Sequence, residues 1–287
     1  MEIMKKPPWL KKRIPPYQDL LKIKSILNET KLHTVCEEAR CPNLGECFSN
    51  GTATILILGR ICSRNCGFCA VEHGVPAPAD EAEPERVAWA VKKMGLQYVV
   101  ITSVTRDDLP DGGASHFAKT IRAIRSQDRK VKVEVLIPDF QGNLSSLTVV
   151  LDEGPDVLNH NIETVPKLYP EVRPQADYRR SLDLLKKSKE PYPHILTKSG
   201  FMLGLGETEN EIIDLLKDLR GVECDFLTIG QYLQPRADRL PVVRYIPPEE
   251  FEEYREIGEE IGFKSVASGP FVRSSFHASQ MFANTSI

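Results

Sequence analysis

Six of the seven cysteines in this chain lie in one short stretch, between Cys36 and Cys69. Crowding of this kind, with an odd total, argues against a disulfide framework and for metal binding. The N-terminus lacks the apolar core of a secretion signal, so we expect a reducing compartment, the cytoplasm. Cys224 stands alone in a hydrophobic run, and we expect it to be a small buried residue.

The second half of this stretch is a tight loop, Cys62-Ser-Arg-Asn-Cys66-Gly-Phe-Cys69. Three thiolates at this spacing can hold three irons of a [4Fe–4S] cube and leave the fourth iron open to a small chelating ligand. A structural zinc site would need four ligands in two pairs, and no second pair stands at the usual spacing. The loop also follows the first candidate strand, and ligands gather at the carboxyl ends of parallel strands. The pattern therefore predicts an iron–sulfur cluster with one open iron.

The first half, Cys36-Glu-Glu-Ala-Arg-Cys41-Pro-Asn-Leu-Gly-Glu-Cys47, also supplies three thiolates. Taken alone, these residues leave two interpretations open. They hold a second cluster, or they form a structural metal knot that packs the N-terminal segment.

The N-terminal arm is basic and rich in proline. It is either a solvated, proline-stiffened arm or a basic arm that meets an acidic protein partner. The whole chain has a net charge of −3, which indicates no global preference for nucleic acid or membrane. No run approaches the roughly 18 apolar residues of a membrane-spanning helix. The charged residues of the arm are Lys5, Lys6, Lys11, Lys12 and Arg13 against Glu2.

After the cysteines, short apolar runs alternate with helical periodicity, which predicts six strand–helix units of an α/β fold. Such units form a parallel sheet, either open and doubly wound or a full or partial barrel. Thr208 is expected to cap its helix in a capping box with Glu211. The candidate strands are Ala53–Leu58, Tyr98–Thr102, Lys132–Ile137, Val157–His160, Ile195–Leu203 and Phe226–Tyr232. The candidate helices are Pro84–Met94, Ala114–Ser126, Asn143–Asp152, Tyr178–Lys189, Thr208–Leu219 and Pro248–Ile261.

The loop of Cys62, Cys66 and Cys69 resembles the hallmark of the radical SAM superfamily, which uses S-adenosylmethionine (SAM). The resemblance implies a partial (β/α)6 TIM-type barrel with this loop after its first strand. It also implies that the amino and carboxylate groups of SAM chelate the open iron. Phe68 matches the aromatic position whose backbone meets the adenine.

Longer segments resemble the lipoyl synthase family in particular, and together they cover nearly the whole chain. They are HTVCEEARCPNLGECF, the CSRNCGFC loop, VTRDDLPDGGASHF (104–117), HNIETV (160–165), KSGFMLGLGET (198–208), LTIGQYLQP (227–235) and the tail GPFVRSSFHA. The resemblance implies three regions: an N-terminal extension (1–50) with the auxiliary ligands, the barrel (51–261) and a C-terminal extension (262–287). One position departs from the family, because Phe276 replaces the usual tyrosine after Arg-Ser-Ser and removes its hydroxyl.

The resemblance implies insertion of two sulfur atoms, at C6 and C8 of an octanoyl chain that is amide-linked to a lysine of a carrier protein. The cluster on Cys62, Cys66 and Cys69 would cleave SAM, and the resulting radical would remove hydrogen from the octanoyl chain. An auxiliary [4Fe–4S] cluster on Cys36, Cys41 and Cys47 would donate the sulfur. Its fourth iron would be held by Ser275 rather than Ser274, and serine oxygen binds iron more weakly than thiolate does. Without the resemblance, Arg273–Ser275 would be taken for a tail turn or a helix cap.

Polar residues near the predicted strand ends are candidates for contacts with SAM, because a buried polar side chain needs a partner. Asn161, Glu163, Lys198 and Gln231 are expected to face the site. For the first three, a purely structural network is the alternative. Arg173 either meets a carboxylate or caps the helix that follows it.

The implied partners are an octanoylated lipoyl carrier domain or a glycine-cleavage H protein, an electron donor such as ferredoxin or flavodoxin, and an iron–sulfur carrier for cluster repair. No nucleic acid or membrane is expected. Three rivals stay open. A methylthiotransferase would add an RNA- or protein-binding domain. A two-cluster electron carrier would use four cysteines for each cluster. A zinc-binding interaction module would contain zinc and no sulfide.

Overall fold

The computed structural model describes residues 5–12, 17–50 and 52–284. Glu2 and Arg13 of the basic arm, residue 51 at the expected start of the barrel and the last three residues of the expected C-terminal extension lie outside this description. Among the described residues, no helix combines the length and the apolar character needed to cross a membrane.

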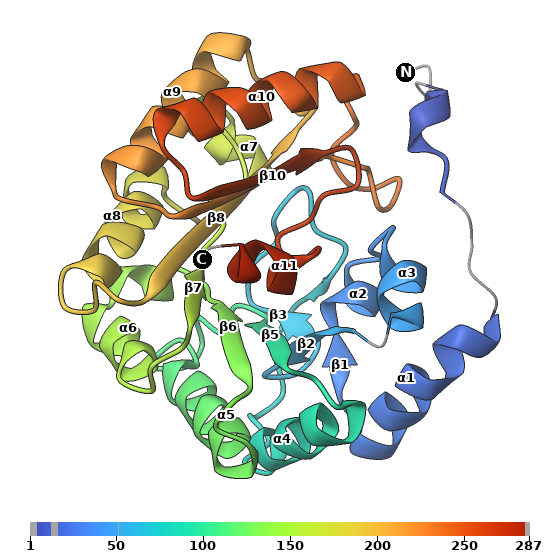
Figure 1. The fold of residues 1–287 in the computed structure, drawn as a ribbon, viewed down its shortest axis with the longest axis vertical. Coiled ribbons are helices and arrows are strands. Elements are labelled where there is room, and N and C mark those ends of the chain that lie inside the picture. The colour runs from blue at the N-terminus through green and yellow to red at the C-terminus, as the bar shows by residue number, and fades with distance from the viewer. Residues whose placement is uncertain (1–4, 13–16, 51, 285–287) are drawn as a thin grey trace.

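Eight strands form one sheet in the order β1-β2-β5-β6-β7-β8-β9-β10. Its centre is six parallel strands, which confirms the predicted strand–helix alternation: β2 (Thr54–Ile57), β5 (Tyr98–Ser103), β6 (Lys132–Leu136), β7 (Val157–Asn159), β8 (Leu196–Leu203) and β9 (Phe226–Gln231). The strands curve into an arc with helices on its outer side (Figure 1). The fold is thus an α/β fold of the expected partial-barrel kind.

The outer helices follow the strands one by one, as the periodicity predicted. Thr208 caps α9 through the full capping box with Glu211. Since each outer helix buries only the face that meets the sheet, its other face is polar. The helices are α4 (Glu83–Met94), α5 (Ala114–Gln127), α6 (Leu144–Leu151), α8 (Tyr178–Lys189), α9 (Glu209–Gly221) and α10 (Pro248–Ile261), with the short α7 (Tyr169–Val172) between β7 and α8.

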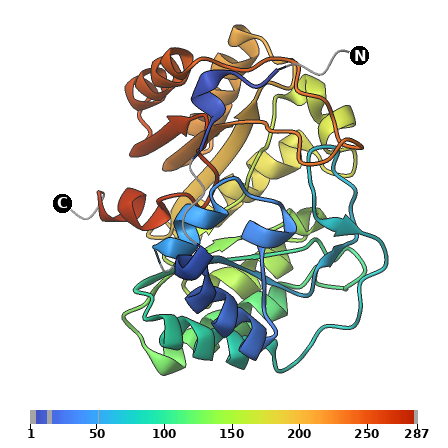
Figure 2. The same ribbon diagram turned by 90° about the vertical axis from the view of Figure 1, so that its right-hand side faces the viewer.

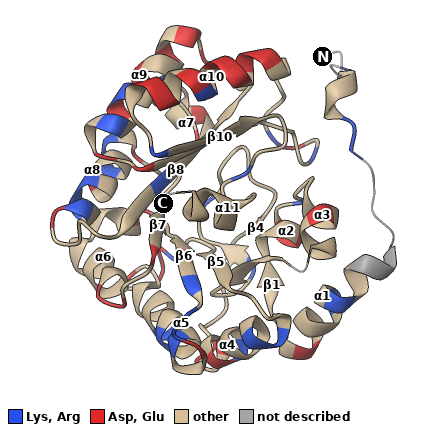
Figure 3. Cartoon of the chain, in the orientation of Figure 1, with Lys and Arg blue, Asp and Glu red and all other residues tan. Residues whose placement is uncertain are grey.

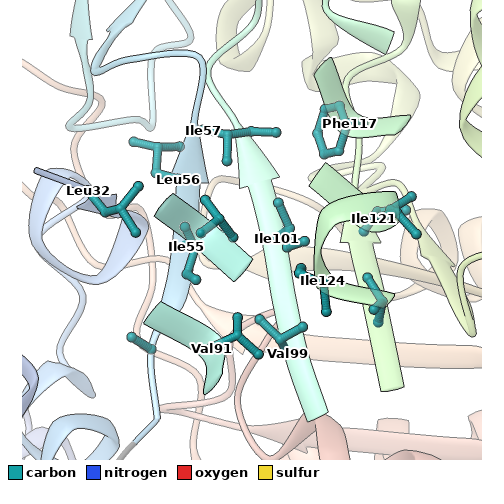
Figure 4. Close-up of a cluster of buried hydrophobic side chains, with 14 of the residues drawn as sticks. Leu32, Ile55, Leu56, Ile57, Val91, Val99, Ile101, Phe117, Ile121 and Ile124 are labelled. Carbon is teal, nitrogen blue, oxygen red and sulfur yellow. The ribbon is translucent and has the colours of Figure 1, made fainter. Parts of the chain in front are cut away.

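The main core lies between the sheet and its outer helices. Ile55 and Ile57 of β2 and Ile101 of β5 are fully buried, and Ile121 and Ile124 of α5 pack against the same layer (Figure 4). Continuous apolar runs of this kind are typical of parallel strands that are covered on both faces. Cys224, expected to be a small buried residue, is 0% exposed.

Both ends of the chain add to the sheet. β1 (His33–Thr34) pairs antiparallel with β2, after α1 (Tyr17–Thr30), and β10 (Ser265–Gly269) pairs parallel with β9. The chain then crosses the arc and forms α11 (Ala278–Ala283), which lies over the opening of the arc in Figure 1 and at the edge of the molecule in Figure 2. Met281 of α11 packs on Val157 and Phe226, the first residues of their strands. α11 therefore covers the amino ends of β7 and β9.

Two short helices, α2 (Val35–Glu38) and α3 (Leu44–Ser49), follow β1, and a two-stranded sheet of β3 (Ile61–Cys62) and β4 (Glu72–His73) flanks the second cysteine loop. Figure 2 shows α2 and α3 in front of the barrel, near the C-terminal tail.

Candidate active site

One cavity of about 540 Å³ collects the six clustered cysteines. We call Cys62, Cys66 and Cys69 the loop triad, and Cys36, Cys41 and Cys47 the helical triad. The cavity is also lined by residues near the carboxyl ends of β5 to β9, and by the tail residues Val272, Arg273, Ser274, Ser275 and Phe276. Segments that are far apart in the sequence thus meet around one cavity that is open to solvent on one part of its lining.

The loop triad is reached through a left-handed turn at the end of β2. Leu58 has a φ of +66° and Gly59 has +85°, so the chain reverses there into the cysteine loop. The Leu58 amide donates to the Glu83 carboxylate at 2.7 Å, and the His116 ring lies 2.7 Å from the same oxygen. Glu83 and His116 are both buried. A buried network in the outer helices therefore fixes the point where the loop begins.

Arg64, between the first two cysteines of the loop, is 5% exposed and ties the loop to two neighbouring loops. Its Nε donates to Asp107 Oδ2 at 2.6 Å and its Nη2 to Asp107 Oδ1 at 2.9 Å. The same Nη2 donates to Asp139 Oδ1 at 2.6 Å. Asp139 is fully buried, also pairs with Arg180, and the Arg64 guanidinium holds the pKa of its carboxyl well below the ordinary range against the opposing effect of burial. Bidentate pairs of this type fix orientation as well as charge.

Backbone contacts hold the rest of the loop. The Gly67 amide donates to Val172 O at 2.9 Å, and a Cβ on Gly67 would come within 2.9 Å of Glu171 O, so no larger residue fits without movement. The amides of Arg64 and Thr105 point at the Cys62 sulfur, at 3.4 and 3.3 Å. N–H groups directed at sulfur favour the thiolate that binds iron.

The helical triad is built differently. Thr34 caps α2, which carries Cys36, and Cys47 lies on α3. Asn43, buried between the two helices, donates to Phe271 O of the tail at 2.7 Å. The triad is thus joined to the C-terminal extension by a side chain, and not by the buried ion pairs that hold the loop triad.

Burial raises the pKa of four of these thiols. Cys47 and Cys66 reach about 11, and Cys36 and Cys69 about 12. Buried thiols of this kind become thiolates when a metal supplies the compensating charge, and binding then releases protons. In the described chain no three Cys, His, Asp or Glu side chains converge on one point as ligands of a single ion would. Thiolates of a cubane each bind a different iron, so the residues fit a cluster of three ligated irons.

The two serines of the tail differ in their contacts. Ser274 Oγ accepts a hydrogen bond from Asn161 Nδ2 at 2.5 Å. The side chain of Ser275 lines the same cavity, and among the described residues it has no hydrogen-bond partner. Arg273 beside them is half-buried, and the loss of solvent around it lowers the pKa of its guanidinium. The tail therefore brings one engaged hydroxyl, one available hydroxyl and a half-buried cation to the triads.

Asn161 and Glu163 lie in the cavity wall, as expected. Asn161 Nδ2 also donates to Glu163 Oε1 at 3.0 Å, while its buried Oδ1 has no partner. Glu163 has a φ of +67°, and burial raises the pKa of its carboxyl. Strain of this kind and an unpaired buried oxygen are typical of binding sites. Arg173 lines the cavity too and donates to Asn161 O at 2.7 Å, whereas Asp177 caps α8.

The expectation that Lys198 and Gln231 face the site is wrong. β8 runs to Leu203, so Lys198 lies near its amino end, where Nζ pairs with Glu134 at 3.1 Å. Lys198 therefore belongs to the structural network that was its alternative. Gln231 points between strands and donates from Nε2 to Leu203 O at 3.1 Å. Neither residue lines the cavity.

Phe68 lines the cavity, and its contact with adenine stays a prediction. The sequence reasoning missed Arg64 and gave Arg273 no role of its own. The sequence did contain a signal for Arg64. This charged residue stands between two cluster cysteines, and Asp107 and Asp108 follow the predicted strand Tyr98–Thr102 as possible partners. Arg273 carried no such signal, since its burial depends on the tail entering the barrel.

Comparison with known protein families and relatives covers the segments that form this site. The radical SAM superfamily matches residues 56–219, and the N-terminal domain of lipoyl synthase of the radical SAM family matches residues 1–41. The lipoyl synthase of Caldanaerobacter subterraneus subsp. tengcongensis is 59% identical over 96% of this chain and 96% of its own length. That of Alkaliphilus metalliredigens is 56% identical over 98% of this chain and 97% of its own.

Solved structures share the fold at low identity. Streptococcus suis SuiB bound to S-adenosylmethionine aligns with a TM-score of 0.56 at 16% identity, over 71% of this chain and 46% of its own. HydG, a maturase of the [FeFe]-hydrogenase, aligns at 0.54 and 15% identity, over 93% of this chain and 74% of its own. With relatives matched from end to end and with both cysteine triads in place around one cavity, the chain belongs to the lipoyl synthase family of the radical SAM superfamily.

Proposed function

We propose that this enzyme inserts two sulfur atoms, at C6 and C8, into an octanoyl chain carried on a lysine of a protein, and so makes the lipoyl group. The observation that carries the proposal is the single cavity that both cysteine triads and the Arg-Ser-Ser tail line together. A radical that forms at one triad and a sulfur atom held at the other must reach the same short acyl chain, so the two centres need a common space.

The loop triad would hold the [4Fe–4S] cluster of the superfamily, with SAM on its open iron. When bound, this pair supplies the radical that removes hydrogen from an unactivated carbon. The chain's own part is placement. Asn161, Glu163 and Arg173 offer an unpaired amide oxygen, a carboxylate and a guanidinium to the polar groups of SAM. Phe68 from the loop adds an aromatic wall near Tyr232 and Met202.

The helical triad would hold a second cluster, which is consumed as the sulfur substrate. Cys36, Cys41 and Cys47 leave one of its irons without a thiolate, and Ser275 is the hydroxyl that is available to hold it. An oxygen ligand is weaker than thiolate on iron, so this side of the cluster opens more readily than the others. We propose that Phe276, in place of the usual tyrosine, leaves this ligation unchanged.

The walls between the triads suit an apolar acyl chain. Leu56, Val104, Ile137 and Phe201 line the cavity and are nearly free of solvent contact. Exclusion of water protects a carbon radical from side reactions, and apolar walls favour the methylene groups of the octanoyl chain. The cavity thus supports both the substrate class and the chemistry.

We also propose the surroundings of the enzyme. The seven cysteines are free thiols, which suits a reducing location, the cytoplasm. The acylated partner would be a lipoyl carrier domain or a glycine-cleavage H protein. A ferredoxin or flavodoxin would supply electrons, and an iron–sulfur carrier would rebuild the consumed cluster. Residues 1–50 and 262–287 would act as extensions that bring auxiliary ligands to the barrel of residues 51–261.

The test is an assay of the reconstituted enzyme with dithionite, SAM and an octanoyl-lysine peptide, read by mass spectrometry. We expect the peptide product to contain two added sulfur atoms. We also expect the reconstituted enzyme to contain about eight irons per chain, as two cubanes require. A chain that binds zinc and no sulfide, or a peptide that gains no sulfur, would contradict the proposal.

A further inference from the structure

Where described residues line its mouth, the cavity carries positive charge and no negative charge. Among the described residues that line it, those exposed to solvent are Lys6, Arg40 and Gln234. Glu163, the one carboxylate among the described lining residues, is half-buried and accepts a hydrogen bond from Asn161. The charge that the described lining residues present to solvent is therefore positive.

This charge is local, because the chain as a whole has a net charge of −3. Figure 3 shows many of its acidic residues on the outer helices α9 and α10. The acids beside Arg40 in the sequence are turned to other partners. Glu37 accepts from the Thr34 hydroxyl at 3.1 Å, and Glu38 lies 3.3 Å from the His33 ring.

Neither cation is neutralised within the described part of the chain. Arg40 has a single long contact, from Nη1 to Pro235 O at 3.5 Å, and Lys6 has no ion pair there. The backbone of Arg40 lies in the left-handed region, with a φ of +51°. A non-glycine residue in this conformation is uncommon, and such strain clusters at functional sites. Lys6 comes from the N-terminal arm and Arg40 from the segment between two cysteines, so two separate parts of the chain bring exposed positive charge to the lining of one cavity.

We propose that Lys6 and Arg40 form a docking surface for an acidic protein segment that presents the acylated lysine. The inference rests on the proposed function, because an octanoyl chain on a lysine must enter the cavity while its carrier stays at the mouth. Unpaired rim charges act mainly on association, since complementary potentials steer a partner of opposite sign. The surface thus selects the carrier by charge, and the cavity selects the acyl chain by shape.

The test uses three short peptides with the same octanoyl-lysine, flanked by glutamates, by glutamines or by lysines. With the reconstituted holoenzyme at low ionic strength, we expect kcat/KM for the glutamate-flanked peptide to exceed that for the lysine-flanked peptide about tenfold. The difference should lie in KM, with kcat alike, and should shrink at high ionic strength because surface charges are screened.

Charge reversal then assigns the preference to the two residues. Lys6→Glu should raise KM for the glutamate-flanked peptide about fivefold and leave the glutamine-flanked peptide unchanged. Arg40→Glu should act in the same direction, and its iron content is measured as well because Arg40 precedes Cys41. Arg129→Glu and Lys130→Glu are the matched controls, since both residues are exposed in the turn before β6, away from the carboxyl ends of the strands.

Equal KM values for the three peptides with the wild-type enzyme would overturn the docking surface. The same holds if Lys6→Glu and Arg40→Glu change the preference no more than the controls do. Failure of the proposed function looks different, because no peptide would then gain sulfur under any condition.

Discussion

The loop triad and the helical triad face one cavity, yet the protein holds them in different ways. The loop triad is fixed by a buried guanidinium that pairs with Asp107 and Asp139, and by backbone hydrogen bonds to several neighbouring loops. In the helical triad, Cys36 and Cys47 lie on helices of four and six residues and Cys41 lies between these helices. The arm and the tail hold the two helices through side chains such as Asn43 and Lys12. Buried paired charges resist displacement far more than contacts near the surface do.

This difference supports the proposed division of roles. A cluster that acts as a reusable catalyst needs the same geometry at every turnover, and a rigid surround preserves it. A cluster that gives up sulfur has to open and be rebuilt, so its surround has to yield.

The largest effect is expected from a substitution that removes a ligand of the loop triad. Cys66→Ala removes one of three thiolates, and the open cubane is then no longer held for SAM. We expect reductive SAM cleavage to fall at least about a thousandfold, measured as 5′-deoxyadenosine released with dithionite. The helical triad should keep its irons in this variant. SAM cleavage that persists in Cys66→Ala would mean that the two triads have been given the wrong roles.

The next prediction tests the rigidity of the loop triad. Arg64→Gln leaves Asp139 fully buried with only Arg180, at 3.3 Å, as its cationic partner. Loss of one member of a buried pair costs about 3–5 kcal/mol, so we expect a lower urea midpoint and less iron on the loop triad. Arg125→Gln is the control, because Arg125 pairs with Asp156 at 3.0 Å near the surface of the barrel. If both variants lose the same stability, the Arg64 network is not what fixes the loop.

The third prediction concerns the ligand of the helical triad. Ser275→Ala should leave SAM cleavage near the wild-type rate and reduce sulfur insertion about tenfold to a hundredfold, as loss of a metal-site partner does. Ser274→Ala is the matched control. It removes an acceptor from Asn161, whose amide still has Glu163 as a partner, so we expect a change of no more than about threefold. The reverse ranking would assign the ligand to Ser274.

Much of the fold follows from the sequence because local patterns control it. The six parallel strands and the capping box at Thr208 depend on apolar runs and on residues a few positions apart. β10 and α11 were not predicted, since their stability comes from neighbours that are distant in the sequence. Val266 of β10 pairs with Leu227 of β9, and Met281 of α11 rests on Val157.

The residues of the site also differ in whether local sequence patterns or distant contacts place them. Both cysteine triads were predictable because metal ligands need fixed spacing, and all six cysteines line the cavity. Lys198 was misplaced although its strand was predicted almost as observed, Ile195–Leu203 against Leu196–Leu203. A buried lysine also finds a partner inside a barrel, here Glu134, and no local pattern distinguishes that partner from a ligand. The network of Arg64 depends on three loops meeting, which no local pattern records.

The smallest expected effect lies where the arm meets the tail. Lys12 pairs with Glu46 at 2.7 Å and lies over the rings of Phe271 and Phe276, at 5.0 and 5.2 Å. Lys12→Met keeps the aliphatic stem and removes the charge, so we expect a loss of stability below about 1 kcal/mol. Iron should nevertheless leave the helical triad several-fold faster when a chelator is added, because this contact joins α3 to the tail. The loop triad should lose its iron at the wild-type rate. If the chelator instead strips both triads of the variant equally fast, the arm supports the whole barrel and the contrast between a fixed and a yielding site does not hold.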